Sequence, residues 1–400
     1  MSKSSTSASK VIGEGTYGCV TKPSLRCSTN HTDYTHKLSK IMLKKHALEE
    51  YKEMQQITAL KGIEKYIISM PRLCEPKIDN AFIRTVEKCE NEKFKKAHID
   101  DFRMLIVEDG GISLKQFSDE IIHTLDENGL CIFFTKLYHL LEGLLFFHKH
   151  DIVHHDIKSR NIVYNIETGQ IRFIDFGLMK KRSQMIRESQ RNENDMAQSW
   201  ENFPPEYSCA NKENFEEPVC NYGDLSHKEF LRKMSKTFDW YSFGLMMKRL
   251  MKDSMDLIER KLSKDRVQEV YKFFSQMADS EIEMRSENIQ EMTIQYKQML
   301  EKQQLWCTDT PKPSDHSVRL QRRLEKTLEL SPKDKTVLIR TLEKRKACRE
   351  GFERNRTTRK CMKKCKPGYV RNRKTNRCRK VRIQPTTKKA KKNNRSEKKK

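Results

Sequence analysis

The 400-residue sequence lacks any apolar run of about 18 residues, the length that a membrane-spanning helix needs. Its first ten residues, MSKSSTSASK, are polar and lack the apolar core of a secretory leader. Acidic residues are scarce at one end only. Residues 301–400 contain 10 Asp and Glu against 35 Lys and Arg, whereas residues 1–300 contain 45 of each class. We therefore expect no membrane span, no secretion, and a neutral body followed by a cationic extension.

Most of the cysteines show no regular spacing. Of the twelve in the chain, eight are scattered: Cys19, Cys27, Cys74, Cys89, Cys131, Cys209, Cys220 and Cys307. Scattered cysteines in a chain without a secretory leader indicate a reducing compartment.

Apolar spacing predicts how the body is organised. Strands are expected first, within 11–20, 36–43 and 102–108, with a helix at 47–60. Long apolar helices are expected later, at 130–150 and 239–250. A strand-rich first third followed by a helical part predicts an α+β fold with two lobes.

A glycine-rich segment lies within the first expected strand pair. Residues 13–20 match G-x-G-x-x-G-x-V, which alone is a weak signal because dinucleotide-binding turns use the same glycines. Here a strand follows rather than a helix, and the glycines let backbone amides approach phosphate oxygens with no Cβ in the way. The candidate nucleotide-binding residues are Ile12, Gly13, Glu14, Gly15, Thr16, Tyr17, Gly18, Cys19 and Val20, with Glu108 at the end of the 102–108 strand.

A second motif, HHDIKSRN, places a carboxylate and an amide five residues apart, at Asp156 and Asn161. Asp175 begins the sequence Asp-Phe-Gly 19 residues after Asp156. Phosphoryl transfer needs metal ions that neutralise the phosphates and a carboxylate that orients the attacking hydroxyl and accepts its proton. Asp156 suits the hydroxyl, while Asn161 and Asp175 suit the metal.

With these motifs in this order, residues 10–305 resemble a eukaryotic-type protein kinase. The resemblance implies a bilobal fold with a β-rich N-lobe and an α-helical C-lobe, ATP and Mg²⁺ as cofactors, and proteins as substrates. It also implies that Lys158 contacts the γ-phosphate and favours serine/threonine specificity. The PPE segment at 204–206 corresponds to a further element of the family pattern, and Ser199 lies where such kinases carry the Ser/Thr of their substrate-docking loop. Asp239 corresponds to an aspartate that braces the catalytic loop.

The same resemblance calls for a lysine on the third strand. Lys40 fits best because its neighbours are apolar, with Lys37 as the alternative. Its expected partner on the 47–60 helix is Glu53. Glu50, three positions away and near the same helical face, is the alternative.

The sequence departs from the family pattern at two places and also shows a narrower resemblance within the family. His155 stands where the family has an arginine that receives an activation-loop phosphate, and PPE replaces APE. The 37–42 stretch, the loop with Cys27 and the wording of HHDIKSRN most resemble protein kinases of large nucleocytoplasmic DNA viruses. This implies a location in the host cytoplasm or the virion.

Two 14-residue units near the C-terminus, 348–361 and 365–378, share 7 identical positions at a period of 17 residues. They resemble two-cysteine adaptor modules attached to assorted enzymes of large DNA viruses. Three states of their cysteines remain open: a disulfide within each unit, one zinc site using all four thiolates, or a reduced, flexible basic segment. The four cysteines are Cys348, Cys361, Cys365 and Cys378.

These observations divide the chain into five parts and leave two alternatives to an active kinase. We expect that residues 341–400 bind nucleic acid or viral particle components. The alternatives are a pseudokinase scaffold and a small-molecule phosphotransferase. The expected parts are a disordered N-terminus (1–9), the kinase domain (10–305), a linker with an amphipathic helix (306–345), the tandem repeat (346–380) and a basic disordered tail (381–400).

Overall fold

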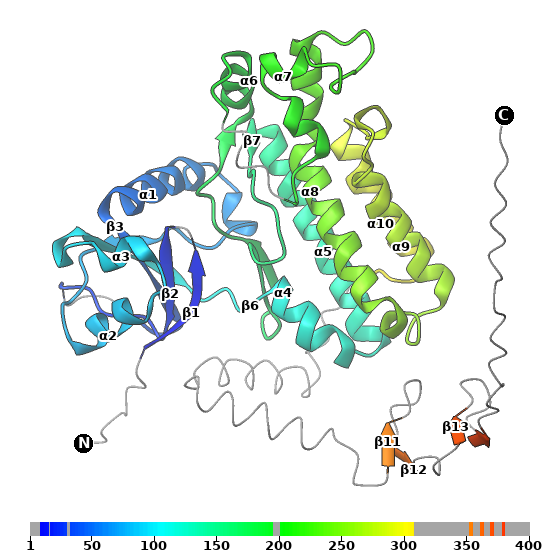
Figure 1. Cartoon of the computed structure of the whole chain (residues 1–400), viewed down its shortest axis with the longest axis horizontal. Helices are drawn as coiled ribbons and strands as arrows, with labels where there is room; N and C mark the ends of the chain where they lie inside the picture. The colour runs from blue at the N-terminus through cyan, green and yellow to red at the C-terminus, as the bar shows by residue number, and fades with distance from the viewer. Residues whose placement is uncertain are drawn as a thin grey trace, which may run out of the picture. The chain divides into compact units, whose positions relative to one another are not determined.

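The computed structural model describes residues 9–15, 17–29, 33–194 and 201–307, and four short strands between residues 352 and 380 (Figure 1). The chain forms two units, Met1–Glu329 and Leu330–Lys400. Residues 1–8, Thr16, Ser199 and most of the expected linker and tail lie outside the described residues.

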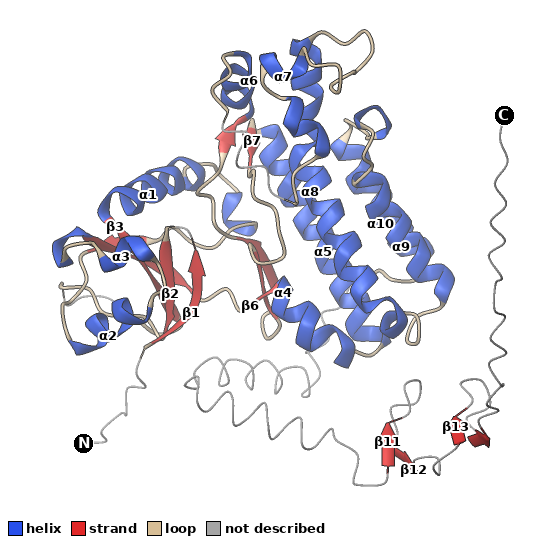
Figure 2. Cartoon of the chain, in the orientation of Figure 1, coloured by secondary structure: helices blue, strands red, loops and turns tan. Residues whose placement is uncertain are grey.

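The first third of the chain forms a five-stranded antiparallel sheet with the order β1-β2-β3-β5-β4 (Figure 2). Ile41 and Met104 face each other across β3 and β5 and are fully buried. Their neighbours Met42 and Leu105 are buried in a second cluster, so both faces of these central strands are covered. The strands are β1 (Lys10–Gly15), β2 (Gly18–Lys22), β3 (Lys37–Leu43), β4 (Arg72–Cys74) and β5 (Phe102–Glu108).

Helix α1 (Lys44–Thr58) follows β3 directly and packs Ala47 against Met42 and Leu105 of the sheet. Its Met54 and Ile57 are buried in the larger core of the second part of the chain. Leu48, the neighbour of Ala47, is 46% exposed. The helix is thus rotated so that Ala47 rather than Leu48 faces the sheet.

The sequence did not predict the short helices between β4 and β5. They are α2 (Asn80–Lys88), α3 (Glu92–Lys95) and the 3-10 turn Ile99–Asp101. Asp79 begins α2 by accepting the N–H groups of Ala81 and Phe82, and Asn91 begins α3 by accepting that of Lys93.

The second part of the chain is mostly helical and surrounds α5 (Glu127–Lys149) (Figure 1). Asp126 begins α5 by accepting the Gly129 N–H, and the helix has ten buried residues, nine of which belong to the main core. Trp240 and Phe243 of α8 belong to the same core. The other helices are α4 (Leu114–Gln116), α6 (Arg182–Gln190), α7 (Lys212–Phe215), α8 (His227–Ile258), α9 (Lys264–Met277) and α10 (Ile289–Lys302). The expected two-lobed α+β architecture is confirmed.

Two small sheets carry the loops that follow α5 (Figure 2). In the first, β8 (Ile162–Asn165) lies between β6 (Ile112–Ser113) and β9 (Gln170–Phe173). In the second, β7 (Ile152–Val153) pairs with β10 (Lys180–Lys181). The HHDIKSRN loop therefore runs between β7 and β8, and the Asp-Phe-Gly segment runs between β9 and β10.

Among the described helices, α5 alone is long and apolar enough to cross a membrane by length and composition. Its most apolar 18-residue window has a mean hydropathy of 1.6, and 56% of that window is buried. Burial inside a protein core accounts for this apolar composition.

All eight of the scattered cysteines are paired in four disulfides. The Cα atoms of each pair lie 5.8–6.3 Å apart, within the range that a disulfide requires. The pairs are Cys19–Cys89, Cys27–Cys74, Cys131–Cys307 and Cys209–Cys220. Their scatter along the sequence was therefore no sign of reduced thiols, because residues up to 176 positions apart are brought together by the fold.

Each C-terminal repeat contains one short antiparallel hairpin. In the first, β11 (Phe352–Arg354) pairs with β12 (Cys361–Lys363), and in the second, β13 (Tyr369–Arg371) pairs with β14 (Cys378–Lys380). The registers correspond, because Phe352 faces Lys363 as Tyr369 faces Lys380. Cys348 and Cys365 lie outside the described residues, so the three states of the repeat cysteines stay open.

Candidate active site

The glycine-rich segment forms the turn between β1 and β2. A Cβ at Gly18 would lie 2.5 Å from the backbone oxygen of Ile41, so only glycine fits there. A Cβ at Gly13 or Gly15 would meet nothing closer than 3.9 Å, which leaves space beside their backbone. Ile12 lies where the β1–β2 register shifts. The turn can therefore present backbone amides to phosphate oxygens, while Thr16 lies outside the described residues.

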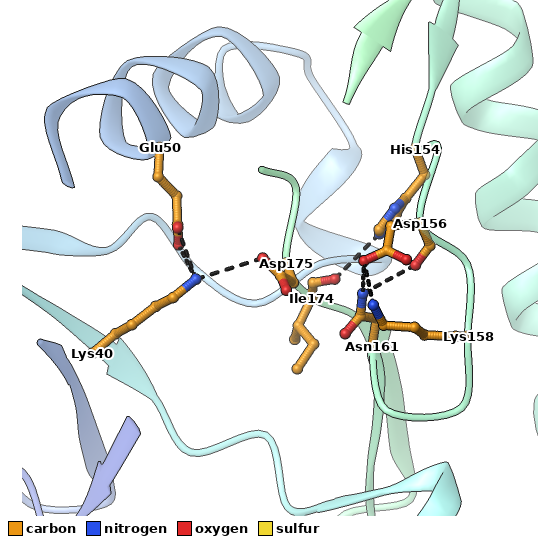
Figure 3. A network of polar contacts seen from close by, with 8 residues as sticks. All are labelled: Lys40, Glu50, His154, Asp156, Lys158, Asn161, Ile174 and Asp175. Atoms are coloured by element: carbon orange, nitrogen blue, oxygen red, sulfur yellow. Dashed lines mark hydrogen bonds and ion pairs between the residues drawn. The ribbon is translucent and has the colours of Figure 1, made fainter. Parts of the chain in front are cut away.

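Lys40 of β3 directs its ammonium toward two carboxylates (Figure 3). Its Nζ lies 2.8 and 2.7 Å from the two oxygens of Glu50, and 3.5 Å from Oδ1 of Asp175. The predicted partner Glu53 was wrong, and the alternative Glu50 takes its place. The reason is geometric: α1 begins directly after β3, and Glu53 lies about 4.5 Å further along the helix axis than Glu50.

The alternative lysine, Lys37, lies at the beginning of β3, opposite Glu108 of β5. Because side chains alternate along a strand, Lys37 and Lys40 leave β3 on opposite faces. Glu108 itself ends β5 beside the turn to β6, with Oε2 3.5 Å from Nη1 of Arg172.

Burial and neighbouring charges shift the pKa values of Lys40, Asp175 and Glu53. Burial opposes the charged form of Lys40, but the carboxylates of Asp175 and Glu50 outweigh it and raise its pKa. The ammonium of Lys40 in turn lowers the pKa of Asp175 against the effect of burial. Burial, followed by the nearby carboxylates of Glu50 and Glu49, raises the pKa of Glu53 to about 7, and the charge of Lys40 only partly opposes this rise. Lys40 and Asp175 are therefore an ionised pair at neutral pH.

Asp156 lies on the loop between β7 and β8 and is almost fully buried. Its Oδ2 accepts hydrogen bonds of 2.7 Å from Lys158 Nζ and from Asn161 Nδ2 (Figure 3). Burial raises the pKa of Asp156, and the Lys158 hydrogen bond and charge oppose that rise. Its Oδ1 has no hydrogen-bond partner within the described part of the chain. One oxygen thus fixes the carboxylate, and the other is buried with its hydrogen-bonding capacity unused among the described residues.

Asp239 of α8 holds the backbone of this loop. Its Oδ2 accepts the N–H of His154 at 2.6 Å, and its Oδ1 accepts the N–H of His155 at 2.9 Å. His155 has the left-handed φ of 67°, a conformation that needs such support in a residue other than glycine. Burial raises the pKa of Asp239 to about 7, although both N–H donors oppose this.

His154 connects the loop to the Asp-Phe-Gly segment. Burial lowers the pKa of His154 to about 4, so the ring is neutral at pH 7. Its Nε2 lies 3.2 Å from the carbonyl oxygen of Ile174 and must donate, because a carbonyl only accepts (Figure 3). This hydrogen bond links the HHDIKSRN loop, which contains Asp156, to Ile174, the residue directly before Asp175.

The ring of His155 is enclosed by aromatic side chains. The ring centroids of Phe238, Phe203 and Tyr207 lie 4.6, 4.9 and 5.5 Å away. Burial, with the positive charge of Lys180 nearby, lowers the pKa of His155 to about 3. His155 is therefore an uncharged part of a hydrophobic cluster.

The PPE segment is anchored by a buried ion pair. Glu206 lies 2.5 Å from Nη2 of Arg285, and the two side chains are 2% and 0% exposed. Breaking such a pair from one side leaves an uncompensated buried charge. Ser199, which is expected in the substrate-docking loop, lies outside the described residues.

The residues present fit Mg²⁺ and a nucleotide triphosphate. Magnesium prefers oxygen ligands, and the site offers the ionised carboxylate of Asp175 together with the amide oxygen of Asn161. Asn161 uses its Nδ2 to hold Asp156, which leaves its amide oxygen for a metal. Asp175 has a left-handed φ of 63°, and its side chain is 43% exposed.

One further group of residues near the site could not be predicted from the sequence. Residues 89–93, which join α2 to α3 and include the beginning of α3, contact the β1–β2 hairpin. No motif marks this segment, and only the folded chain brings it beside the turn.

Comparisons with known proteins place the chain in context. A model of the protein kinase domain matches residues 6–334. The chain is 48% identical over 56 residues to a probable serine/threonine-protein kinase mkcC of Dictyostelium discoideum, covering 14% of this chain and 6% of that protein. It is 30% identical over 178 residues to cyclin-dependent kinase 12 of Drosophila melanogaster, covering 42% of this chain and 13% of that protein. The matched part is thus a small fraction of each relative's length.

Proposed function

The chain belongs to the protein kinase family, and on that premise we propose that it transfers the γ-phosphoryl group of ATP to serine and threonine hydroxyls of proteins. One observation carries the proposal above the others: Lys40 joins Glu50 of α1 to Asp175, so the nucleotide-side and metal-side groups are already aligned (Figure 3). A kinase is competent for transfer only when this lysine–glutamate pair and the metal-binding aspartate are both in place.

The chemistry follows from the positions of the side chains. Bound Mg·ATP supplies the phosphoryl group and the metal charge that neutralises it. Asp156 orients the substrate hydroxyl through Oδ1 and accepts its proton as the hydroxyl oxygen bonds to the γ-phosphorus, while the bond from that phosphorus to the bridging oxygen breaks and ADP leaves. Lys158 stands 2.7 Å from the other oxygen of Asp156, where its charge can stabilise the transferred group. Lys40 holds the non-transferred phosphates.

The same fold could serve a pseudokinase scaffold or a small-molecule phosphotransferase. A scaffold has no need of Lys40, Asp156, Asn161 and Asp175 together, and Lys158 with the PPE segment favours a protein acceptor. Incubation with γ-labelled ATP and either casein or small alcohols separates the three functions. We expect label on casein only, whereas label on an alcohol, or on neither acceptor, overturns the proposal.

We further propose that basal activity does not require activation-loop phosphorylation. The enclosed, neutral His155 cannot receive a phosphate as an arginine does. Ser183 already donates to Asp151 at 2.8 Å, so a phosphate there would face a carboxylate, and Ser189 is fully buried. Purified enzyme should therefore keep its activity after phosphatase treatment. A loss of more than about tenfold, roughly 1.4 kcal/mol of transition-state stabilisation, would contradict this.

We also propose that residues 341–400 target the kinase to polyanionic partners, either nucleic acid or components of the viral particle. This segment contains 26 Lys and Arg against 4 Asp and Glu. Arg354 and Arg371 recur at equivalent places in the two repeats, beside the aromatic pair Phe352 and Tyr369. Arginine binds phosphate bidentately, and an aromatic neighbour can stack on a base.

Deletion of residues 341–400 tests this role. The shortened protein should phosphorylate generic peptides at the rate of the full chain, because the described site uses no residue beyond 307. It should lose binding to DNA and RNA, and the binding of the full chain should weaken steeply with salt. Equal binding by both proteins at low salt would show that the segment only improves solubility. Loss of binding on changing the four repeat cysteines to serine would assign recognition to the folded repeats rather than to charge.

The resemblance to kinases of large nucleocytoplasmic DNA viruses supports a further proposal, that the protein acts in infected cells or in the virion. Disulfides persist in oxidising surroundings and are rare in the cytosol. The four disulfides of the catalytic unit therefore favour the virion of the two locations. Phosphoproteomics of purified particles would identify the substrates there.

A further inference from the structure

The segment between β4 and β5 forms a small, firmly packed insert on the N-terminal sheet. Phe82 of α2 and Phe94 of α3 are buried and pack edge-on against Phe102 of β5, with ring centroids 5.9 and 5.0 Å from it. These contacts fix the insert to the sheet, so residues between the two helices have a defined position.

The tip of this insert, residues 89–93, lies against the glycine-rich turn. Cys89 is joined to Cys19 of β2 by a disulfide. The Glu90 N–H donates to the Glu14 carboxylate at 3.2 Å, on the other strand of the turn. The turn is therefore held on both sides.

Two side chains of the tip add to these contacts. Asn91 donates from Nδ2 to the Gly15 carbonyl oxygen at 3.5 Å. Its Oδ1 accepts the N–H of Lys93 and so begins α3, which fixes the direction of the amide. The Lys93 ammonium lies 5.7 Å from the ring centre of Tyr17. The contacts thus follow the turn along its length rather than at one point.

We propose that residues 89–93 are a clamp that positions the glycine-rich turn for nucleotide, and that the Cys19–Cys89 disulfide makes nucleotide affinity depend on redox state. The proposal rests on the proposed kinase function, because the turn is the phosphate-binding element. A glycine-rich turn is intrinsically mobile, and ordering it on binding costs affinity. A turn ordered beforehand by the clamp avoids that cost.

Reduction reverses the covalent part of the clamp. A dithiol reductant donates two electrons and two protons to the Cys19–Cys89 bond, giving two thiols, and is itself oxidised to a cyclic disulfide. The contacts of Asn91 and Glu90 remain, so the turn is loosened rather than released.

The test compares Cys89→Ser and Asn91→Ala with Cys74→Ser in the full-length protein. Cys74→Ser removes the neighbouring Cys27–Cys74 disulfide of the same lobe, which does not involve the turn, and so controls for lost stability. Amide hydrogen exchange of residues 11–20 is measured without nucleotide, and Mg·ADP affinity is measured by calorimetry. KM for ATP and kcat are measured separately on a peptide substrate.

We expect faster exchange in residues 11–20 and about threefold to tenfold weaker Mg·ADP binding for Cys89→Ser and Asn91→Ala. KM for ATP should rise by the same factor with kcat nearly unchanged. Cys74→Ser should match the wild type in hydrogen exchange, Mg·ADP affinity and KM for ATP. A dithiol reductant should bring the wild type to the level of Cys89→Ser and leave that variant unaffected.

Unchanged exchange and affinity in both clamp variants would overturn the proposal, as would an equal change in Cys74→Ser. If the wild type binds no nucleotide, the proposed kinase function fails instead. Hydrogen exchange still reports in that case whether the clamp orders the turn.

Discussion

Replacing Asp156 with alanine should lower kcat by about 10²–10⁴-fold while leaving Mg·ATP binding nearly intact. The carboxylate acts on the substrate hydroxyl, and its contacts in the structure are with Lys158 and Asn161 rather than with the groups around Lys40. Rate and affinity are measured separately, by peptide phosphorylation and by calorimetry with Mg·ATP.

Asp175→Ala is the matched comparison for this prediction. Its carboxylate is ionised and exposed toward the metal position, so its loss should weaken Mg·ATP binding as well as the rate. Equal losses of ATP affinity in the two variants would contradict the division of roles between the carboxylates.

The second large effect is expected at Lys40. Lys40→Ala should lower kcat/KM by about 10²–10³-fold, the usual result of removing one preorganised charge from a phosphate-binding site. The lysine is held by Glu50, so Glu50→Gln should also lower activity, by about tenfold or more. Steady-state kinetics at varied ATP concentrations provide both values.

Glu53→Gln is the control, because Glu53 lies on the same helix as Glu50, whereas Lys40 forms its ion pair with Glu50. With a pKa of about 7, Glu53 is already protonated in much of the protein at neutral pH, and glutamine resembles that form. Its activity should stay within about threefold of the wild type. A larger loss at Glu53 than at Glu50 would show that the ion pair of the structure is not the one used in catalysis.

The sequence predicted which residues gather at the site better than it predicted the contacts between them. Asp156, Asn161 and Asp175 could be assigned because each belongs to a short motif whose roles depend on neighbours within a few residues. The partner of Lys40 could not, because Glu50 and Glu53 lie near one helical face, and only the packing of α1 on β3 decides between them. Glu50 was weighed as the alternative for that reason.

The insert and the disulfides were missed for a related reason. Residues 80–95 contain no motif, and their contact with the glycine-rich turn depends on the packing of Phe82 and Phe94 against Phe102. Cysteine pairing likewise follows from the fold, since Cys131 and Cys307 meet only when the end of the catalytic unit returns to α5. Spacing in the sequence carries no information about such long-range contacts.

The most direct test of the account is transfer from γ-labelled ATP to three peptides that differ only in having serine, threonine or tyrosine at one position. The wild type should label the serine and threonine peptides steadily and the tyrosine peptide hardly at all, and Asp156→Ala should label none of them. Bound ATP without transfer to any peptide or protein, or equal labelling by Asp156→Ala, would contradict the assignment of this chain as an active serine/threonine kinase.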